Sequence, residues 1–214
     1  MKAIMSWCFV AVLAFSLSAL AQERSNTLRL PKPDTVGGKP LMQTLSERKT
    51  SRSFSDKKLP DQILSNLLWA AFGINRPDGH RTAPSAMNWQ EIDMYVATAD
   101  GVFLYEPKTH ALKSVLTGDF RAKTGGQDFV AAAPVNIVYI ADLKKVGSAN
   151  PEDVSLYSGA DCGFIAQNVY LFCASEGLAT VVRANIDRPT LGKKMKLGTD
   201  QRITLSQTVG YPKK

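Results

Sequence analysis

The spacing of apolar residues changes along the chain and predicts both helices and strands. Between Ile63 and Ala71 the apolar positions recur three and four residues apart, which corresponds to one face of a helix. Pro60 suits the first position of this helix, and Gly73 suits its end. From Ile92 the period becomes two, which is typical of a half-buried strand.

The next segments predict an antiparallel meander. Asp100 and Gly101 form a hairpin turn signal, and the segments 102–106 and 111–116 have the composition of strands. The mostly apolar run 133–143 is rich in Val and Ile and predicts a central strand. A closing strand is expected at 203–212.

A long helix is predicted from Asn150 to Glu176. It begins with a capping asparagine, a proline and two acidic residues, and Gly177 provides its end. Its residues are apolar almost all the way round, so we expect it to be buried on every side. It is then either a central helix or a helix at an oligomer seam. The small residues Gly159 and Gly163 would let a second backbone approach closely, but packing within one subunit would explain them too.

Two shorter helices, at 41–49 and 188–196, complete the expected elements. Helices that flank a mainly antiparallel sheet define the class as α+β. Residues 22–40 contain several prolines and glycines and predict an extended N-terminal arm with little core of its own. The folded domain is therefore expected to span 41–214.

The first residues predict a secretory signal peptide at 1–21. Lys2 gives a basic start, an apolar stretch follows, and Ala19-Leu20-Ala21 is a small-residue cleavage site. The apolar stretch is shorter than the roughly 20 residues that a membrane-spanning helix needs. We therefore expect an exported protein, periplasmic or secreted, with no membrane anchor in its mature form.

The chain is basic, with 26 Lys and Arg against 19 Asp and Glu and a formal net charge of +7. Such a charge favours anionic ligands in general. It does not indicate nucleic acid, because the sequence has no long basic run and no recognisable nucleic-acid module.

Cysteine and histidine usage gives no reason to expect a disulfide or a metal site. Cys162 and Cys173 lie on the same predicted helix, eleven residues apart. That spacing separates them by roughly 16 Å, whereas a disulfide needs Cα atoms within about 7 Å. We interpret both as small buried residues. His80 and His110 do not show zinc-finger spacing with them, so no metal is expected.

The sequence offers no catalytic constellation of side chains. It lacks the G-x-S-x-G, H-E-x-x-H and P-loop patterns, and it also lacks the Rossmann glycine pattern. If the protein is an enzyme, a cofactor would carry the difficult chemistry.

Two polar segments are candidates for binding. The stretch R-K-T-S-R at 48–52 concentrates three cations around hydroxyls; it is either a solvated surface or a site for an anion such as phosphate. The segment P-S-A-M-N-W-Q at 84–90 offers amides that can both donate and accept, as the edge of a heteroaromatic ring requires. It ends a long polar loop that begins near Asn75, and long loops often bind a ligand or control access to a site.

Four motifs in order resemble the nitroreductase-like flavoproteins. They are R-K-T-S-R-S-F at 48–54, P-S-A-M-N-W-Q at 84–90, G-x-A-T-V-V-R-A-N-I-D at 177–187 and V-G-Y-P at 209–212. The resemblance covers Leu41 to Pro212. The A-P-S pattern is shared with the thiazole/oxazoline oxidase branch, whereas Asn88-Trp89-Gln90 is more similar to the general branch.

The resemblance implies FMN bound at the interface of a homodimer, with the long helix as the dimer helix. The basic motif would hold the phosphate and one edge of the flavin through Arg48, Lys49, Thr50 and Arg52. The partner subunit would contribute Pro84, Ser85, Ala86 and Asn88. The backbone of Val182, Arg183 and Ala184 would pass along the ring, with an N–H near Ala184 directed to N5. The family usually adds a C-terminal cation, here Lys213.

Arg183 and Asn185 depart from the Gly or Glu that the family often has at these positions. His80 and Arg81 are the candidate substrate contacts in the loop. Taken together, the expected function is an exported FMN-dependent oxidoreductase that exchanges hydride or electrons between a donor and a small electron-poor acceptor. Two alternatives stay open: a flavin-binding protein without turnover, and a cofactor-free interaction module.

Overall fold

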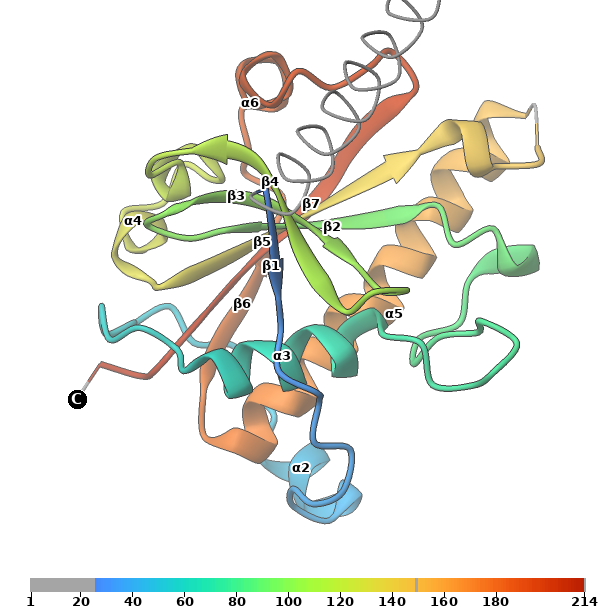
Figure 1. Cartoon of the computed structure of the whole chain (residues 1–214). Coiled ribbons are helices and arrows are strands. Elements are labelled where there is room, and N and C mark those ends of the chain that lie inside the picture. The colour runs from blue at the N-terminus through green and yellow to red at the C-terminus, as the bar shows by residue number, and fades with distance from the viewer. Residues whose placement is uncertain (1–25, 149, 214) are drawn as a thin grey trace, which may run out of the picture.

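The computed structural model describes residues 26–148 and 150–213 (Figure 1). The predicted signal peptide at 1–21 lies outside the described residues. Seven strands form one sheet in the order β1-β4-β3-β2-β5-β7-β6, and every neighbouring pair is antiparallel. The strands are β1 (Thr27–Arg29), β2 (Ile92–Ala97), β3 (Gly101–Glu106), β4 (Ala111–Thr117), β5 (Val135–Asp142), β6 (Ala179–Arg183) and β7 (Gln201–Gly210). The predicted α+β class and antiparallel sheet are confirmed.

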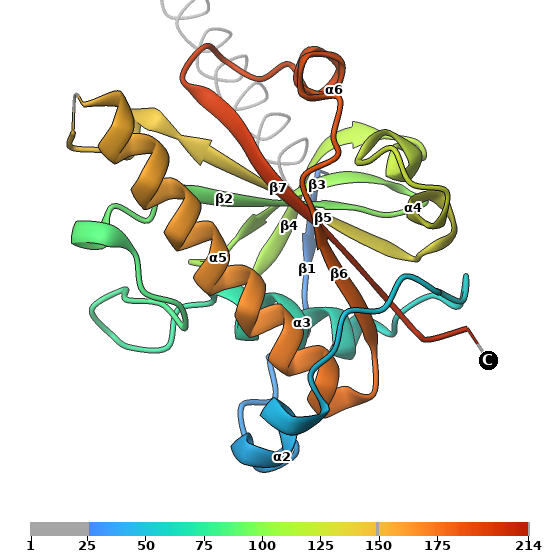
Figure 2. The ribbon, with the colours of Figure 1, turned by 180° about the vertical axis from the view of Figure 1, so that it is seen from behind.

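Helices cover both faces of the sheet. They are α2 (Leu41–Glu47), α3 (Asp61–Phe72), α4 (Phe129–Ala132), α5 (Pro151–Glu176) and α6 (Arg188–Met195), with short 3-10 turns η1 (Ala86–Asn88), η2 (Arg121–Lys123) and η3 (Leu143–Lys145). Figure 2 shows α5 and α3 lying across one face. Buried residues of these two helices form the main core with one face of β2, β5 and β7. The α6 side chains Leu191 and Met195 pack against the opposite face.

The long helix α5 begins and ends as its sequence predicts. The side chain of Asn150 accepts from the Glu152 N–H at 3.1 Å, Pro151 occupies the first turn, and Gly177 closes the helix with a φ of 69°. A residue with a side chain would be strained at that φ. The cap therefore stops α5 where β6 must start.

Of the two interpretations of α5, a central helix covered on every side does not apply within the single chain, because one face of α5 is exposed. Leu156 is 64% exposed and Phe164 is 47% exposed. Gly159, Ala160 and Gly163 between them are exposed as well. These residues recur three and four apart, so they form one stripe along α5. We call Leu156, Gly159, Ala160, Gly163 and Phe164 the α5 stripe.

Other differences from the sequence predictions are small. Pro60 precedes α3 as its cap instead of occupying its first position, and Gly73 ends α3 with extended backbone. The extended N-terminal arm includes a short strand that the sequence did not predict, because β1 pairs with β4 at the edge of the sheet. Among the described residues, no helix is long and apolar enough to cross a membrane.

Candidate functional site

The basic segment 48–52 runs along the open edge of β6. Since β6 pairs only with β7 in the sheet, its other edge is free for a neighbour. The Ser51 N–H donates to the Thr180 carbonyl at 2.9 Å and fixes the segment at this edge. Extended backbone sends alternate side chains to opposite sides. Accordingly Arg48 and Thr50 face Tyr170, whereas Lys49 and Ser51 line a cavity.

Tyr170 of α5 joins the segments that the sequence nominated separately. Its hydroxyl accepts from the Val182 N–H at 3.0 Å and lies 3.1 Å from Thr50 Oγ1. Its ring lies 5.4 Å from the Arg48 guanidinium carbon. The buried Tyr170 hydroxyl thus accepts a β6 hydrogen bond that a neighbouring strand would otherwise accept. Sequence analysis missed Tyr170, because a tyrosine on an apolar helix looks like a core residue.

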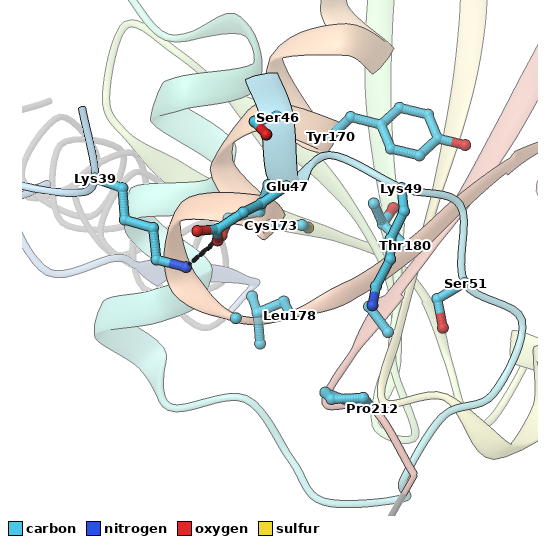
Figure 3. A pocket seen from close by; sticks show the side chains of 13 residues that line it. Lys39, Ser46, Glu47, Lys49, Ser51, Tyr170, Cys173, Leu178, Thr180 and Pro212 are labelled. Carbon is cyan, nitrogen blue, oxygen red and sulfur yellow. Dashed lines mark hydrogen bonds and ion pairs between the residues drawn. The ribbon is translucent and has the colours of Figure 1, made fainter. Parts of the chain in front are cut away.

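A cavity of about 480 Å³ lies beside this junction (Figure 3). The Lys39–Glu47 ion pair lies on one side of it in this view, and the Lys49 side chain lies on the other. Its lining combines hydroxyls, such as that of Ser51, with apolar groups from Leu178 and Pro212. The cavity is therefore amphipathic and lies next to the β6 edge.

The cations at this edge have no acidic partners among the residues that the structure describes. Within 26–148 and 150–213, no ion pair involves Arg48, Lys49 or Arg52. The C-terminal residues run antiparallel to the next part of the segment: the Ser55 N–H donates to the Tyr211 carbonyl at 2.9 Å. Lys213 N donates to the Ser53 carbonyl at 3.3 Å. The structure thus brings the predicted C-terminal cation to the basic segment.

The segment 84–90 packs against the N-terminal half of α5, whereas the basic segment contacts Tyr170 in its C-terminal half. The Ala86 N–H donates to Asp161 Oδ2 at 2.8 Å, and the Trp89 ring packs edge-on against Tyr157 at 5.8 Å. Asp161 and Tyr170 are nine residues apart, which is about 13 Å along a helix. Within one chain, therefore, the two predicted binding segments do not meet.

The conformation of this segment is unusual. Met87, Asn88 and Gln90 all have positive φ, at 48°, 56° and 50°. Such backbone costs energy for residues with side chains and is found most often at functional sites. Side chains hold it in place: Gln90 Nε2 donates to Asn88 Oδ1 at 2.8 Å, and the Gln90 N–H donates to Ser85 Oγ at 2.8 Å. Asn88 thus has a fixed orientation.

Buried carboxylates lie directly beneath this segment. Glu91 has no exposed surface, and its Oε2 accepts from Ser85 Oγ at 3.2 Å, while Oε1 has no hydrogen-bond partner among the described residues. Burial, with repulsion from Asp161, raises the pKa of Glu91. Glu91 and Asp161 thus hold the segment through Ser85 and Ala86. Pro84 and Met87 are exposed on its outer side.

At the end of β6, the backbone and the side chains of Val182, Arg183 and Ala184 have different surroundings. Val182 uses its N–H for Tyr170, and Ala184 is exposed at the surface. The Arg183 side chain turns away from α5 and is only 4% exposed. Of the three, Arg183 could therefore meet a ligand at the β6 edge only through its backbone.

The loop candidates His80 and Arg81 have different surroundings. His80 Nδ1 lies 2.9 Å from Asp78 Oδ1 near the surface. Arg81 is partly buried over the Phe72 ring, and its Nε donates to Gln90 Oε1 at 2.9 Å. Arg81 thereby ties the loop to the segment 84–90, and His80 is the more accessible of the two.

Neither the other histidine nor the cysteines offer a reactive group. His110 lies between Ser65 Oγ at 2.7 Å and the Tyr105 hydroxyl at 2.9 Å, a relay that the sequence did not reveal. Ser65 is fully buried, however, and donates to the Pro31 carbonyl at 2.6 Å, so the relay anchors the N-terminal arm. The buried Cys162 and Cys173 are both free, as expected, and burial raises the pKa of Cys162 to about 12.

Comparison with known proteins gives consistent matches. The sequence model of the Nitroreductase family matches residues 45–211. A Methanocaldococcus jannaschii protein provisionally named a nitroreductase is 29% identical over 166 residues, covering 73% of this chain and 83% of the relative. A crystal structure of a Ralstonia eutropha protein, also provisionally named a nitroreductase, is 42% identical with a TM-score of 0.84, covering 88% of this chain and 90% of that chain. A Desulfovibrio desulfuricans structure in complex with FMN is 20% identical with a TM-score of 0.61, covering 83% of this chain and 89% of that chain, a likeness of fold alone.

Proposed function

Because this chain belongs to the nitroreductase family, we propose that it is a homodimeric, FMN-dependent oxidoreductase. It would take electrons from a donor and pass hydride or electrons to a small electron-poor organic acceptor. The observation that carries this proposal is the row of cations at the β6 edge, which form no ion pair with any described residue. Tyr170 holds their segment beside Val182.

The residues at this edge fit FMN. A phosphate brings almost two negative charges, and unpaired Arg and Lys side chains supply charge-assisted donors for it. Arg48 and Arg52 lie in the same segment as Thr50, and Lys213 is brought to that segment by the C-terminal residues. An isoalloxazine ring needs a flat surface with backbone donors, which the exposed backbone at Ala184 can offer.

These positions suggest which role FMN would have and which roles the protein residues would have. Bound FMN would supply the redox chemistry, so no nucleophilic side chain is required. Arg48, Lys49, Thr50 and Arg52 would hold its phosphate side, with Lys49 reaching it from the cavity. Val182, Arg183 and Ala184 would present backbone to its ring. Electrostatic neutralisation in a partly dry site makes each charge-assisted bond worth about 1.5–3 kcal/mol.

A second copy of the chain is needed to complete the site. The α5 stripe is exposed and lined by small residues, and a Cβ added at Gly159 or Gly163 would meet nothing within 4 Å. Two copies of α5 could thus approach closely. If they cross antiparallel at Gly163, residue 163 − n of one copy lies beside 163 + n of the other. The partner's Tyr157 then lies beside Val169 of this copy, one residue before Tyr170. Tyr157 is the residue against which Trp89 packs.

This arrangement brings the two binding segments together across the interface. Pro84, Ser85, Ala86 and Asn88 of one copy would reach the flavin held by the basic segment of the other. His80, in the loop tied to Gln90 through Arg81, would contact the acceptor substrate. The strained backbone at Met87, Asn88 and Gln90 supports this role, because such conformations are kept where a site requires them.

A direct test is to purify residues 22–214 and record the flavin absorbance bands. Cofactor released by acid should be FMN, and the loaded protein should oxidise a donor in the presence of a nitroaromatic or quinone acceptor. Added FMN should also raise the melting temperature, since a ligand that binds only the folded state stabilises it. A yellow protein without turnover would favour flavin storage; a colourless protein that FMN does not stabilise would favour an interaction module.

The double variant Arg48→Ala, Arg52→Ala tests the phosphate assignment. We expect FMN affinity to fall by at least 100-fold, because two charge-assisted contacts of about 1.5–3 kcal/mol each are lost. Lys193→Ala, Lys194→Ala removes the same charge from α6 on the opposite face and should leave affinity unchanged. Unaltered FMN retention in the arginine variant would exclude the assignment.

Export is part of the same proposal. Expression of the full chain in a bacterium, followed by fractionation and N-terminal sequencing, should give a periplasmic or secreted protein that begins at Gln22. A cytoplasmic protein with an intact Met1 would contradict it. Export would also mean that the electron donor need not be a nicotinamide, which is chiefly intracellular.

A further inference from the structure

Arg183, the last residue of β6, carries a buried charge that no acid compensates in the described part of the protein. Its Nε donates to Thr208 Oγ1 at 3.0 Å, Nη1 to the Thr124 carbonyl at 3.0 Å and Nη2 to Asn136 Oδ1 at 3.1 Å. All three acceptors are neutral. Within the described part of the chain, no carboxylate forms an ion pair with Arg183.

The charge is nevertheless present at neutral pH. Burial lowers the pKa of Arg183, but only to about 10, and no nearby acid contributes to the shift. Below that pH the guanidinium therefore remains a cation inside the protein. A buried cation usually has a carboxylate partner, because its lost hydration is otherwise only partly replaced.

The surrounding chain is shaped to enclose this side chain. A Cβ at Gly125 would overlap Arg183 Nη1, so a residue with a side chain there would displace the guanidinium from this position. The neighbouring Gly126 N–H donates to the Asn185 carbonyl at 3.1 Å, which lays the loop across the end of β6. The Thr124 carbonyl that Arg183 contacts also accepts from Ser206 Oγ at 3.0 Å. The guanidinium is thus held in one place and shielded from salt.

The location of this charge connects it to the proposed flavin site. Along β6 the Arg183 side chain shares a face with Val181, which packs in the small cluster with Phe54. Val182 faces the other way and contacts the main core beneath α5. The peptide that follows Arg183 belongs to Ala184, where the flavin ring is proposed to lie. Arg183 would therefore act on the flavin through its field and not by contact.

We propose that Arg183 is a fixed positive charge that stabilises the reduced flavin relative to the oxidised flavin. This inference rests on the proposed FMN function. Reduction by two electrons with uptake of one proton gives the flavin ring a negative charge that the oxidised ring lacks, and a nearby cation favours that form. A unit charge acting over about 10 Å through protein changes an equilibrium by about tenfold. Burial preserves the effect, since counterions screen a buried charge little.

A purely structural clamp is the competing explanation, because Arg183 also fastens the loop at 124–126 to the sheet. The two roles predict different measurements. Loss of a clamp would weaken the binding of oxidised and reduced FMN to the same extent. Loss of a tuning charge would weaken the reduced form more, and would therefore change the ratio of the two dissociation constants.

The experiment uses the full chain loaded with FMN and compares wild type, Arg183→Met, Arg183→Gln and Arg183→Lys. The readouts are the dissociation constants of oxidised and reduced FMN and the midpoint potential of the bound flavin. In the two neutral variants we expect the preference for reduced FMN to fall about tenfold, equivalent to a potential about 30 mV more negative for a two-electron couple. Arg183→Lys, which keeps the charge, should retain most of the preference.

Arg121→Met is the matched control, because the charge of Arg121 is already compensated by Asp119 at 2.8 Å. It should leave the ratio unchanged. If Arg183→Met does not fold, Arg183→Gln still decides the question, since its amide nitrogen takes the approximate place of Nε and can donate to Thr208 Oγ1. A ratio unchanged in the neutral variants would overturn the inference and leave the FMN function standing. Failure of wild type to bind FMN in either form would remove the proposed function first.

Discussion

At the scale of single residues, the Tyr170 hydroxyl has the most connections to the candidate site. It is hydrogen-bonded to Thr50 Oγ1 at 3.1 Å and accepts from the Val182 N–H at 3.0 Å. A buried hydrogen-bond group left without its partner costs about 1–3 kcal/mol. Removing this one oxygen atom therefore disturbs two binding segments at once, while the ring stays to pack beneath Arg48.

Tyr170→Phe should weaken FMN binding about tenfold and lower stability by about 1–2 kcal/mol, because the Val182 N–H loses its acceptor. Titration of the apoprotein with FMN and urea unfolding would measure the two effects. Tyr95→Phe is the control, since that hydroxyl lies 3.5 Å from its nearest partner Gln201, on the opposite face. Equal FMN affinity in Tyr170→Phe and wild type would remove Tyr170 from the site.

Glu91 allows a pH prediction whose sign is fixed by its environment. Burial raises the pKa of Glu91 in the folded state. The folded protein then binds a proton more tightly than the unfolded chain does, so stability is greatest below the unfolded pKa, near 4.5. It falls as the pH rises through the folded pKa and is level above it.

Glu91→Gln should abolish this part of the pH dependence, because the amide imitates the protonated acid. The stability of the variant relative to wild type should be lowest near pH 4 and increase towards pH 8, as measured by urea unfolding. Glu176→Gln, at an exposed position at the end of α5, should show no such trend. A flat difference between Glu91→Gln and wild type would mean that folding does not shift the pKa of Glu91.

At the scale of elements, the fold could be predicted closely from the sequence because each element carries its own local signals. α5 has a cap, a proline and a terminal glycine, and the meander has period two and a turn. These signals act over a few residues and do not depend on the rest of the chain. The matched family and the Ralstonia eutropha structure confirm the nitroreductase-like fold.

Features that depend on distant contacts could not be predicted in this way. Nothing near Arg183 in the sequence indicates that Thr124 and Asn136 will enclose it. The role of Tyr170 depends on Thr50, which lies 120 residues away. Composition indicates an apolar helix at α5, but it does not say which face the same chain covers, so the sequence left a central helix and an oligomer seam as alternatives.

The segment 84–90 provides a prediction about stored strain. Asn88 has a φ of 56°, which a β-branched residue tolerates poorly. Asn88→Val should lower stability by about 1–2 kcal/mol, whereas Asn88→Gly should be nearly neutral. Urea unfolding of both variants would show the contrast. Equal loss in the two would indicate that the side-chain contact with Gln90 matters and that the backbone conformation does not.

At the scale of the whole molecule, the proposed site depends on where the two candidate binding segments lie along α5. One lies near Tyr157 and the other near Tyr170, on a helix whose stripe between them is exposed. In the proposed dimer, each single copy would hold half of a site. An antiparallel pair of copies would make two complete sites, each from one basic segment and one amide-bearing segment, and would couple cofactor binding to dimer formation.

Disruption of the α5 stripe should therefore remove the dimer and the flavin together. Gly163→Glu places a charge where a second backbone would approach, and light scattering should show a monomer. FMN affinity should fall by at least 100-fold, although no residue of the proposed flavin site has changed. Thr190→Glu, an exposed position on α6, should affect neither property. A monomer that still held FMN tightly would contradict a shared site.

Complementation between two defective chains would separate a shared site from an indirect effect of the dimer on folding. One chain carries Arg48→Ala with Arg52→Ala, and the other carries Ser85→Ala with Asn88→Ala. Each homodimer should bind FMN poorly, because every site has one damaged half. A heterodimer isolated through two different tags combines both lesions in one site and leaves the other intact, so it should bind about one FMN per two chains. If each site were built within one chain, both sites of the heterodimer would stay damaged, and no binding would be recovered.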